Sequence, residues 1–239
     1  MPPITRAWFV AVLATTCACS FGLVNPASLI LNYHLVVNKF EIWRLASNFI
    51  FIGSFSFPFV IQLYMLYQYS KQYETNPFNT GAGGTSADYA WMLIIGALLL
   101  CGIGFVLGIP LLGQGLTFMV MYVWSRKNPE ANTSLFSFQF KAFYLPFVLI
   151  GFNVLIGNPV QTPLCGIAVG HAYYFLHYIF PSQYQYDLIH TPSFLIQWFG
   201  GRPSQRPPGL GGTGSQQQPA NRGPYAGHSW GSGRVLGGH

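Results

Sequence analysis

A histidine inside an apolar stretch is the strongest candidate for chemistry in this sequence. His171 directly follows Gly170, and Gly166 lies four residues earlier. An ionisable side chain within a membrane span is a functional candidate, for catalysis or for a hydrogen bond to a neighbouring helix. Two glycines at this spacing let a neighbouring helix approach closely. We therefore predict that Gly166, Gly170 and His171 form a helix-packing site, with His171 hydrogen-bonded to the neighbouring helix rather than catalytic.

Three amide side chains, those of Gln62, Gln114 and Asn153, also fall inside apolar stretches. A buried amide costs free energy unless it finds a partner or water. These residues either line a hydrated cavity or join helices, and the sequence leaves both possibilities open. No pair of Cys or His residues has metal-ligand spacing, and nothing in the chain resembles an intact catalytic site. No catalytic residue, cofactor or metal site is predicted.

A charged and aromatic group lies between the first two apolar stretches. Trp43 suits a membrane interface, where its ring lies in lipid and its N–H in water. Arg44 can pair with Glu41 across one helical turn. Trp43 and Arg44 are either an interfacial anchor or part of a re-entrant loop that shapes lateral access to the helices, and both interpretations stay open.

The carboxyl-terminal tail contains a short island of apolar anchors. Trp230 and Leu236 are set among Gly231, Gly233 and Gly237, and glycines let a backbone lie flat against a partner. Extended peptides of this kind bind by adding to a sheet edge while their anchors fill pockets. We predict a docking peptide. An aromatic residue that occurs by chance in a glycine-rich linker is the alternative.

The composition is that of a membrane protein. Charged residues make up 7% of the chain and hydrophobic residues 51%, whereas a soluble domain has roughly 25% charged residues. The net charge of +6 is spread thinly, without a dense basic block. It therefore indicates membrane topology, and no nucleic-acid partner is predicted.

Apolar segments predict an all-α polytopic membrane protein, a six-span helical bundle. Their expected limits are Ala7–Val24, Phe49–Tyr69, Tyr89–Gly108, Leu112–Trp124, Phe140–Gly157 and Leu164–Phe180. Several are shorter than the ~20 residues of a normal span, and the fourth reaches only about 20 Å. Such a helix must sit inside the bundle or thin the membrane around it. Gly108 and Pro110 break the chain before it at membrane depth, so protein must cover this turn.

Basic residues predict the orientation. Lys39 and Arg44 fall in the first loop, whereas the others fall on the opposite side or in the tail: Arg6, Lys71, Arg126, Lys127, Lys141, Arg202, Arg206, Arg222 and Arg234. The positive-inside rule then puts both termini in the cytosol. Alternatively, Ala7–Ser20 is a cleaved signal peptide, which would leave five spans and separate the two ends.

The chain divides at about Phe199. Gly, Pro, Ser and Gln dominate after that residue, and such a segment cannot bury enough apolar area to fold. We predict a membrane domain over residues 1–199 and a disordered cytosolic tail over 200–239, which acts as a flexible tether.

Four motifs together resemble the derlin family, the rhomboid-like pseudoproteases of the endoplasmic reticulum, over essentially the whole chain. The first three are Trp43-Arg44 in the first loop, Tyr122-Val123-Trp124-Ser125-Arg126 at the end of the fourth span, and Gly166-x-x-x-Gly170-His171 with Tyr173-Tyr174-Phe175-Leu176 in the sixth. The fourth, Trp230-Gly231-x-Gly233-x-x-Leu236-Gly237, is similar to the SHP box that binds valosin-containing protein, the cytosolic AAA ATPase.

This resemblance implies a rhomboid-like bundle without catalysis. Active rhomboids carry a serine in a Gly-x-Ser-Gly motif on the fourth span, and a histidine three residues before the sixth-span glycine pair. A Ser–His dyad needs the hydroxyl within hydrogen-bond reach of the base. Here the fourth span reads Gly113-Gln114-Gly115, and the histidine position is Pro163. Both halves of the dyad are therefore expected to be missing.

The resemblance also implies a role and partners. The role is retrotranslocation of misfolded proteins from the endoplasmic reticulum to the cytosol for degradation. The partners are the AAA ATPase, an endoplasmic-reticulum ubiquitin ligase complex, misfolded clients, membrane lipids and other subunits in a homo- or hetero-oligomer. Two rival functions are an active intramembrane protease and a small-solute transporter or channel. A transporter would be expected to have two similar halves with broken helices, and no convincing internal repeat is found.

Overall fold

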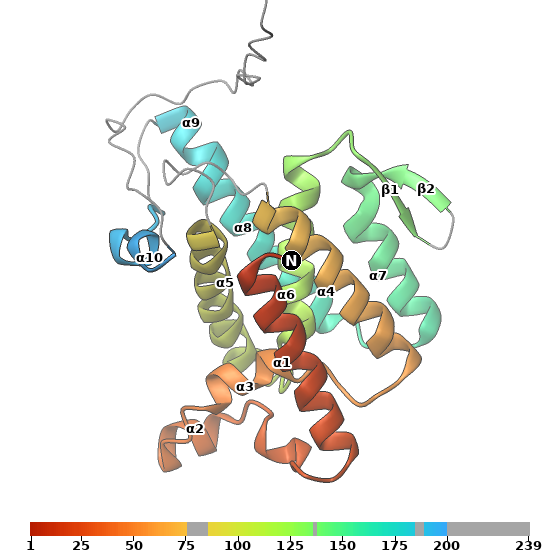
Figure 1. Ribbon diagram of the computed structural model, residues 1–239, viewed down its shortest axis with the longest axis vertical. Helices are drawn as coiled ribbons and strands as arrows, with labels where there is room; N and C mark the ends of the chain where they lie inside the picture. Colours follow the sequence, from red (N-terminus) through yellow and green to blue (C-terminus); the bar gives the residue numbers. More distant parts are fainter. Residues whose placement is uncertain (76–85, 136–137, 185–188, 200–239) are drawn as a thin grey trace, which may run out of the picture.

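A computed structural model describes residues 1–75, 86–135, 138–184 and 189–199. This part of the chain is a bundle of helices with one small sheet (Figure 1), which confirms the predicted all-α fold. The longer helices are α1 (Pro3–Ser20), α4 (Phe57–Thr75), α5 (Ser86–Leu107), α6 (Gly113–Lys127), α7 (Leu145–Ile156) and α8 (Gln161–Tyr174). The shorter ones are η1 (Pro26–Ser28), α2 (Tyr33–Lys39), α3 (Arg44–Ile50), η2 (Ala142–Tyr144), η3 (Phe175–Ile179), α9 (Phe180–Tyr184) and α10 (Ser193–Trp198).

The longer helices alternate in direction, so the bundle has two ends. One, which we name the basic end, holds the start of α1, the last turn of α6 with Arg126 and Lys127, and Lys71 of α4. At the same end α10 packs against the first turn of α5 through Leu195. The other, the loop end, holds η1, α2 and α3 at the bottom of Figure 1. The first residue and residue 199 therefore lie at the same end.

Helix α6 is the centre of the bundle (Figure 1) and is buried along almost its whole length. It packs against α3, α4, α5, α7 and α8, most extensively against α8. Its 15 residues give it a length of only about 22 Å. A short fourth helix cannot face lipid across a full bilayer, and the structure confirms the prediction that it sits inside the bundle.

The turn before α6 contacts the first loop and α3, although Gly108 and Pro110 themselves are exposed. The backbone N–H of Leu31 donates a 2.8 Å hydrogen bond to the carbonyl oxygen of Pro110. Gly113 lies against α3, where a Cβ atom would come within 3.0 Å of the Phe49 carbonyl oxygen. Protein therefore covers this turn only in part, and the prediction that it is fully covered is not confirmed.

The predicted start of the second span was wrong by several residues. We predicted a continuous segment from Phe49 to Tyr69, but α3 ends at Ile50 and α4 begins only at Phe57. Gly53 in the intervening segment has φ of +148°, a conformation that favours glycine. Pro58, the second residue of α4, suits a first helical turn because its missing N–H is not needed there.

The fifth and sixth spans also differ from their expected limits. The fifth was expected from Phe140, but β1 (Asn132–Leu135) and β2 (Phe138–Lys141) form an antiparallel hairpin, with Asn132 opposite Lys141. The helix starts at Leu145 and has 12 residues. The sixth was expected to be short, but the 14 residues of α8 continue through the π-helical turn η3 into α9, which ends at Tyr184.

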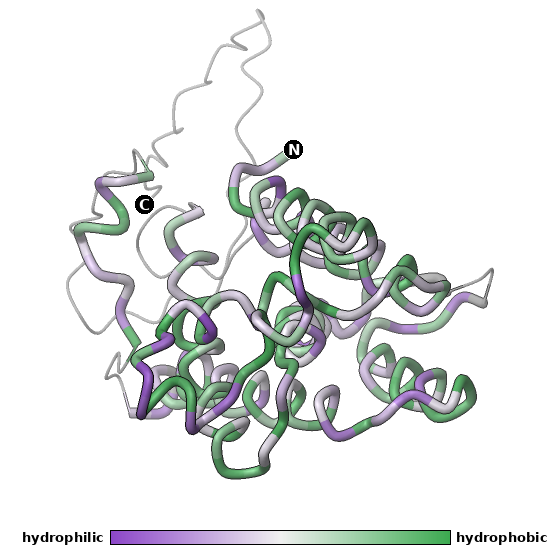
Figure 2. Tube along the Cα trace, turned by 90° about the horizontal axis from the view of Figure 1, so that it is seen from below, coloured by the Kyte–Doolittle hydropathy of each residue, from purple (hydrophilic) through white to green (hydrophobic). Residues whose placement is uncertain are grey.

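The outside of the bundle is apolar. Large apolar side chains are exposed on α5 and α7, including Leu98, Val106, Phe147 and Leu155. Figure 2 shows hydrophobic residues spread over much of the bundle. Exposed apolar surface of this extent indicates contact with lipid. By length and composition, α1 and α5 are the described helices that can each cross a membrane. The count of six crossings stays a prediction.

Candidate functional site

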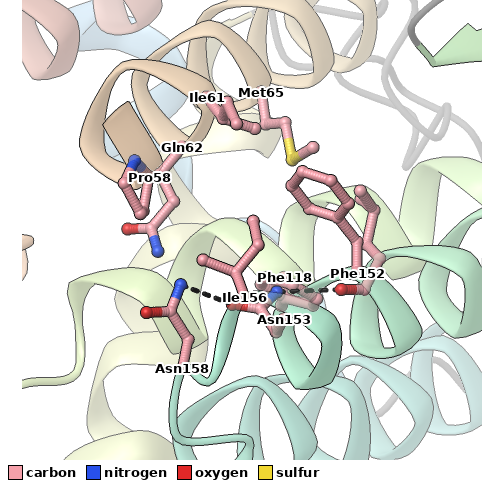
Figure 3. Close-up of a pocket in the computed structure, with 10 residues that line it drawn as sticks. Pro58, Ile61, Gln62, Met65, Phe118, Phe152, Asn153, Ile156 and Asn158 are labelled. Atoms are coloured by element: carbon pink, nitrogen blue, oxygen red, sulfur yellow. Dashed lines mark hydrogen bonds between the residues drawn. The ribbon is translucent and has the colours of Figure 1, made fainter. Parts of the chain in front are cut away.

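A recess opens between α4 and α7 on the side of α6 (Figure 3). It is small, with a cavity volume of about 20 Å³. Helices α4 and α7 make no extended contact with each other, because each packs on α6. The lining residues are Pro58, Ile61, Gln62 and Met65 of α4, Phe118 of α6, Leu149, Phe152, Asn153 and Ile156 of α7, and Asn158.

Asn153 is the polar centre of the recess. Its Oδ1 accepts a 3.1 Å hydrogen bond from Nε2 of Gln114 in α6, and its own Nδ2 donates to the Leu149 carbonyl at 2.8 Å. Asn158 lies next to it, with Nδ2 3.5 Å from the same Oδ1 (Figure 3). Gln62 points into the recess from α4. The hydrogen bond between Gln114 and Asn153 therefore joins α6 to α7. Gln62 and Asn153 line the recess, so Asn153 has both roles that the sequence left open.

The glycine pair of α8 lies against α6. A Cβ atom on Gly166 would collide with the backbone carbonyl of Gly115, and one on Gly170 would meet the Met119 carbonyl oxygen at 3.2 Å. His171, one residue further on, lies with Nδ1 2.8 Å from the hydroxyl of Tyr122. The two backbones can approach this closely only because side chains are missing at the crossing. Sequence reasoning quoted Gly115 and Tyr122 for other reasons, and no pattern marked them as the partners of the glycine pair and His171.

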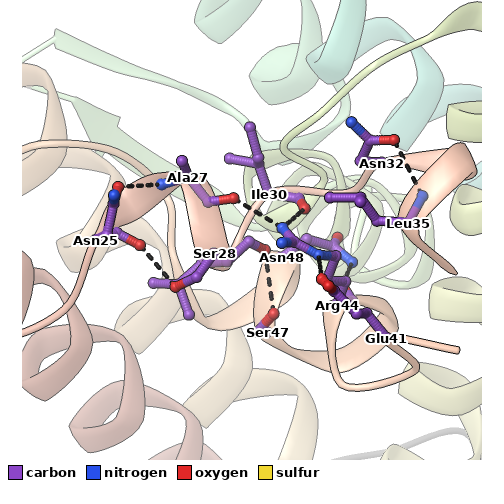
Figure 4. Close-up of polar contacts among 11 residues, drawn as sticks. Asn25, Ala27, Ser28, Ile30, Asn32, Leu35, Glu41, Arg44, Ser47 and Asn48 are labelled. Carbon is purple, nitrogen blue, oxygen red and sulfur yellow. Dashed lines mark hydrogen bonds and ion pairs between the residues drawn. The ribbon is translucent and has the colours of Figure 1, made fainter. Parts of the chain in front are cut away.

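The first loop is organised by Arg44, which is only 6% exposed (Figure 4). Its Nε donates to the Glu41 carboxylate at 2.6 Å, so the expected ion pair is present. A terminal nitrogen of Arg44 also donates to the carbonyl oxygens of Ala27 at 2.7 Å and Ile30 at 3.0 Å. One guanidinium thus ties three stretches of the loop together. Trp43, by contrast, is 56% exposed and available to a membrane surface.

Hydrogen bonds around Arg44 fix this loop to α3. The Ser47 hydroxyl donates to the Leu29 carbonyl at 3.1 Å. Asn48 is fully buried, and its Nδ2 donates to the Arg44 carbonyl at 2.6 Å within α3 itself, so the bond from Ser47 is the one that reaches the loop. Buried polar groups are costly unless they are paired, so these bonds hold the loop in one arrangement. Sequence reasoning missed the backbone carbonyls, because no side-chain pattern marks which ones a distant arginine will reach.

Glu74 is a further polar residue that the sequence did not single out. It is 4% exposed, and its carboxylate accepts hydrogen bonds from the backbone N–H groups of Ile4 and Thr5, from the Thr5 hydroxyl and from the Ser86 hydroxyl, at 2.6–3.0 Å. A carboxylate at a helix N-terminus satisfies orphan donors and complements the helix dipole. Glu74 therefore fastens the start of α1 to α4 and α5.

The remaining predicted site residues are in the tail. Trp230, Gly231, Gly233, Leu236 and Gly237 lie outside the described residues.

Comparison with known proteins agrees with this architecture. A model of the Der1-like family matches residues 1–193. Derlin-2.1 of Arabidopsis thaliana is 38% identical over 215 residues, which cover 85% of this chain and 86% of that protein. Derlin-1 of the same plant is 37% identical over 222 residues, with 90% and 82% covered. Derlin-2 of Oryza sativa subsp. japonica is 38% identical over 211 residues, with 83% of each chain covered. The chain belongs to the Der1-like family, whose members include the derlins.

Proposed function

We propose that this protein is a non-catalytic component of endoplasmic-reticulum-associated degradation that assists the retrotranslocation of misfolded proteins to the cytosol. The observation that carries the proposal is the recess between α4 and α7, where Gln62 and Asn153 place amide groups among apolar side chains. A polar client segment in the bilayer has no water to hydrogen-bond, so each unsatisfied polar group raises its free energy. Amides at the edge of the bundle lower that cost.

Helix length gives a second contribution. Helices α6 and α7 have 15 and 12 residues and so span about 22 and 18 Å, against a hydrocarbon core of about 30 Å. Helix α7 exposes Phe147 and Leu155 to the surroundings. A short lipid-facing helix is accommodated by local thinning of the bilayer. A client beside α7 would then cross less hydrocarbon.

The recess is tested by Gln62→Leu. This change removes the amide that reaches into the recess from α4, and the half-life of a misfolded client, measured by pulse-chase in cells that depend on this chain, should lengthen severalfold. Val60→Leu is the matched control, because Val60 is 49% exposed on the same helix. An unchanged client half-life in the Gln62→Leu variant would contradict the proposal that clients bind in the recess.

Thinning is tested by lengthening α7. Four leucines inserted after Leu155 add about 6 Å and should reduce client export while the bundle still assembles. Normal client export by the lengthened protein would contradict bilayer thinning. It would not bear on the proposal that clients bind in the recess.

The non-catalytic part of the proposal is supported by the geometry around the expected dyad positions. Gln114 bonds Asn153, and the Ser125 hydroxyl donates to the Tyr122 carbonyl of its own helix at 2.7 Å. The position that holds histidine in active rhomboids is Pro163. The purified protein should not cleave a transmembrane rhomboid substrate. Cleavage that one Ser or His substitution abolishes would overturn this part.

The tail would recruit the valosin-containing-protein ATPase to the exit site. A tethered peptide acts at high effective concentration, so modest affinity suffices. Trp230→Ala combined with Leu236→Ala should lower ATPase recovery in a pull-down and leave membrane insertion intact, and equal recovery would contradict the assignment. An endoplasmic-reticulum ubiquitin ligase complex, misfolded clients, membrane lipids and a homo- or hetero-oligomer are the other partners of this proposal.

The proposed location is the endoplasmic reticulum membrane, with both termini in the cytosol. What supports it is that the first residue and residue 199 lie at the basic end, together with Lys71, Arg126 and Lys127. Basic residues are enriched on the cytosolic side of membrane proteins.

A further inference from the structure

Arg126, in the last turn of α6, is held between two aromatic rings. The carbon at the centre of its guanidinium group lies 5.0 Å from the centroid of the Tyr122 ring and 4.3 Å from that of Phe143. Tyr122 is buried, whereas Phe143 is 39% exposed. A cation over two ring faces is attracted by both, more strongly where water is displaced. The rings also fix the plane of the guanidinium, which pre-organises its donors.

The guanidinium lacks an acceptor within the described residues. Its Nε is buried and has no hydrogen-bond partner there. The described carboxylates are engaged elsewhere: Glu41 with Arg44, Glu74 with the start of α1, Asp88 with Thr191 and Glu130 with Lys141. Asp187, the remaining acidic residue of the sequence, lies outside the described part. Buried polar atoms in folded proteins nearly always have a hydrogen-bond partner, so one without a partner requires an explanation.

The surroundings of Arg126 select an anion that is itself attached to apolar material. The Tyr144 ring lies 5.3 Å from that of Phe143, and Tyr144 and Phe147, at the start of α7, are 55% and 53% exposed. Tyrosine and other aromatic rings gather where the hydrocarbon meets the headgroups.

We propose that Arg126, held by the rings of Tyr122 and Phe143, binds the phosphate of an anionic phospholipid in the leaflet at the basic end. The planar fork of an arginine matches phosphate oxygens in a bidentate way. The acyl chains would lie along the exposed rings of α7, beside the helix that borders the recess. The site is separate from the recess and does not rest on the proposed client function.

The test measures lipid binding by the full-length chain in detergent, with dioleoyl phosphatidic acid and dioleoyl phosphatidylcholine as probes in native mass spectrometry. Wild-type protein should retain phosphatidic acid in preference to phosphatidylcholine. Arg126→Gln should lower phosphatidic acid affinity about tenfold or more, the effect of losing hydrogen bonds to a charged group. Arg126→Lys keeps the charge and should bind severalfold more weakly than wild type.

Lys71→Gln is the matched control. Lys71 also lies at the basic end, and its ammonium is 5.6 Å from the Tyr67 ring, but its side chain is exposed. Affinity should stay within about twofold of wild type, because exposed charges contribute little. Equal losses in Lys71→Gln and Arg126→Gln would reduce the site to diffuse surface charge and overturn the proposal.

Further experiments distinguish a phospholipid from the other anions that Arg126 could bind. Glycerol 3-phosphate and inorganic phosphate should fail to displace phosphatidic acid, and displacement by either at similar concentration would assign the site to a soluble phosphate instead. Asp187→Asn should leave binding unchanged, and a marked rise would show that Asp187 is the native partner of Arg126. Should Arg126→Gln fail to fold, Arg126→Lys with an unchanged melting temperature decides the matter, and its full lipid affinity would sink the proposal.

Discussion

Gly166 of α8 lies directly against the backbone carbonyl of Gly115 in α6, and no side chain separates the two helices at this point. The crossing sets how closely α8 packs on the central helix. It also sets the position of Tyr122 beside His171 further along the same pair of helices. The interface depends on backbone contact, so it cannot adjust by rotating a side chain.

Replacement of Gly166 by alanine should therefore destabilise the bundle. The added methyl group collides with backbone atoms of Gly115, so a helix must move, and overpacking of this kind costs about 1–3 kcal/mol. Thermal unfolding in detergent should show a lower midpoint. Gly151→Ala in α7 is the control, because a Cβ there meets nothing within 4 Å. Equal midpoints for the two variants would contradict the close crossing.

Loss of the Glu74 carboxylate should release the start of α1. Glu74→Gln keeps one acceptor oxygen but brings an amide donor toward groups that are themselves donors. We expect a loss of about 2 kcal/mol, in the range of hydrogen bonds to charged groups, in the same unfolding assay. Glu130→Gln, whose side chain is 79% exposed in its pair with Lys141, should be nearly neutral. A neutral Glu74→Gln would show that α1 is held by apolar packing alone.

Arg44→Met should loosen the loop end without unfolding the bundle. The change leaves the Glu41 carboxylate and the carbonyl oxygens of Ala27 and Ile30 without their donor. Breaking a buried ion pair costs about 3 kcal/mol or more, so limited proteolysis of the purified protein between residues 21 and 43 should become much faster. Lys39→Met is the comparison, since Lys39 is exposed. If both variants resist protease like the wild type, Arg44 does not organise the loop.

Glycan mapping should report the orientation. The sequence has one Asn-x-Ser/Thr acceptor, Asn132, which lies in β1 at the basic end and should stay unmodified in cells. Phe40→Ser creates a second acceptor at Asn38, which is exposed at the loop end, and this variant should gain one glycan that endoglycosidase removes. A glycan on Asn132 in the native protein would reverse the topology.

The sequence by itself determined the class of the protein, most of its helices and the residues worth attention. A chain with 7% charged residues cannot cover a soluble surface, and the break at Gly108 and Pro110 separates α5 from a helix too short for lipid. Those are properties of composition and length, which need no knowledge of neighbours. Arg44 was visible because a charged residue stands out in an apolar background, and the glycine pair was visible through its spacing of four residues.

Only the tertiary structure decided what these residues meet. Whether Asn153 faces a cavity or a helix depends on the rotation and crossing of α6 and α7, and it does both. The partners Gly115, Glu74 and the Ala27 carbonyl are distant in sequence from the groups they contact, and no local pattern encodes a distance between helices. The hairpin before α7 and the π-helical turn after α8 were missed because apolar periodicity cannot mark where a helix starts late or adds a residue to a turn. Packing supplies this information, since each helix settles only where its partners let it approach.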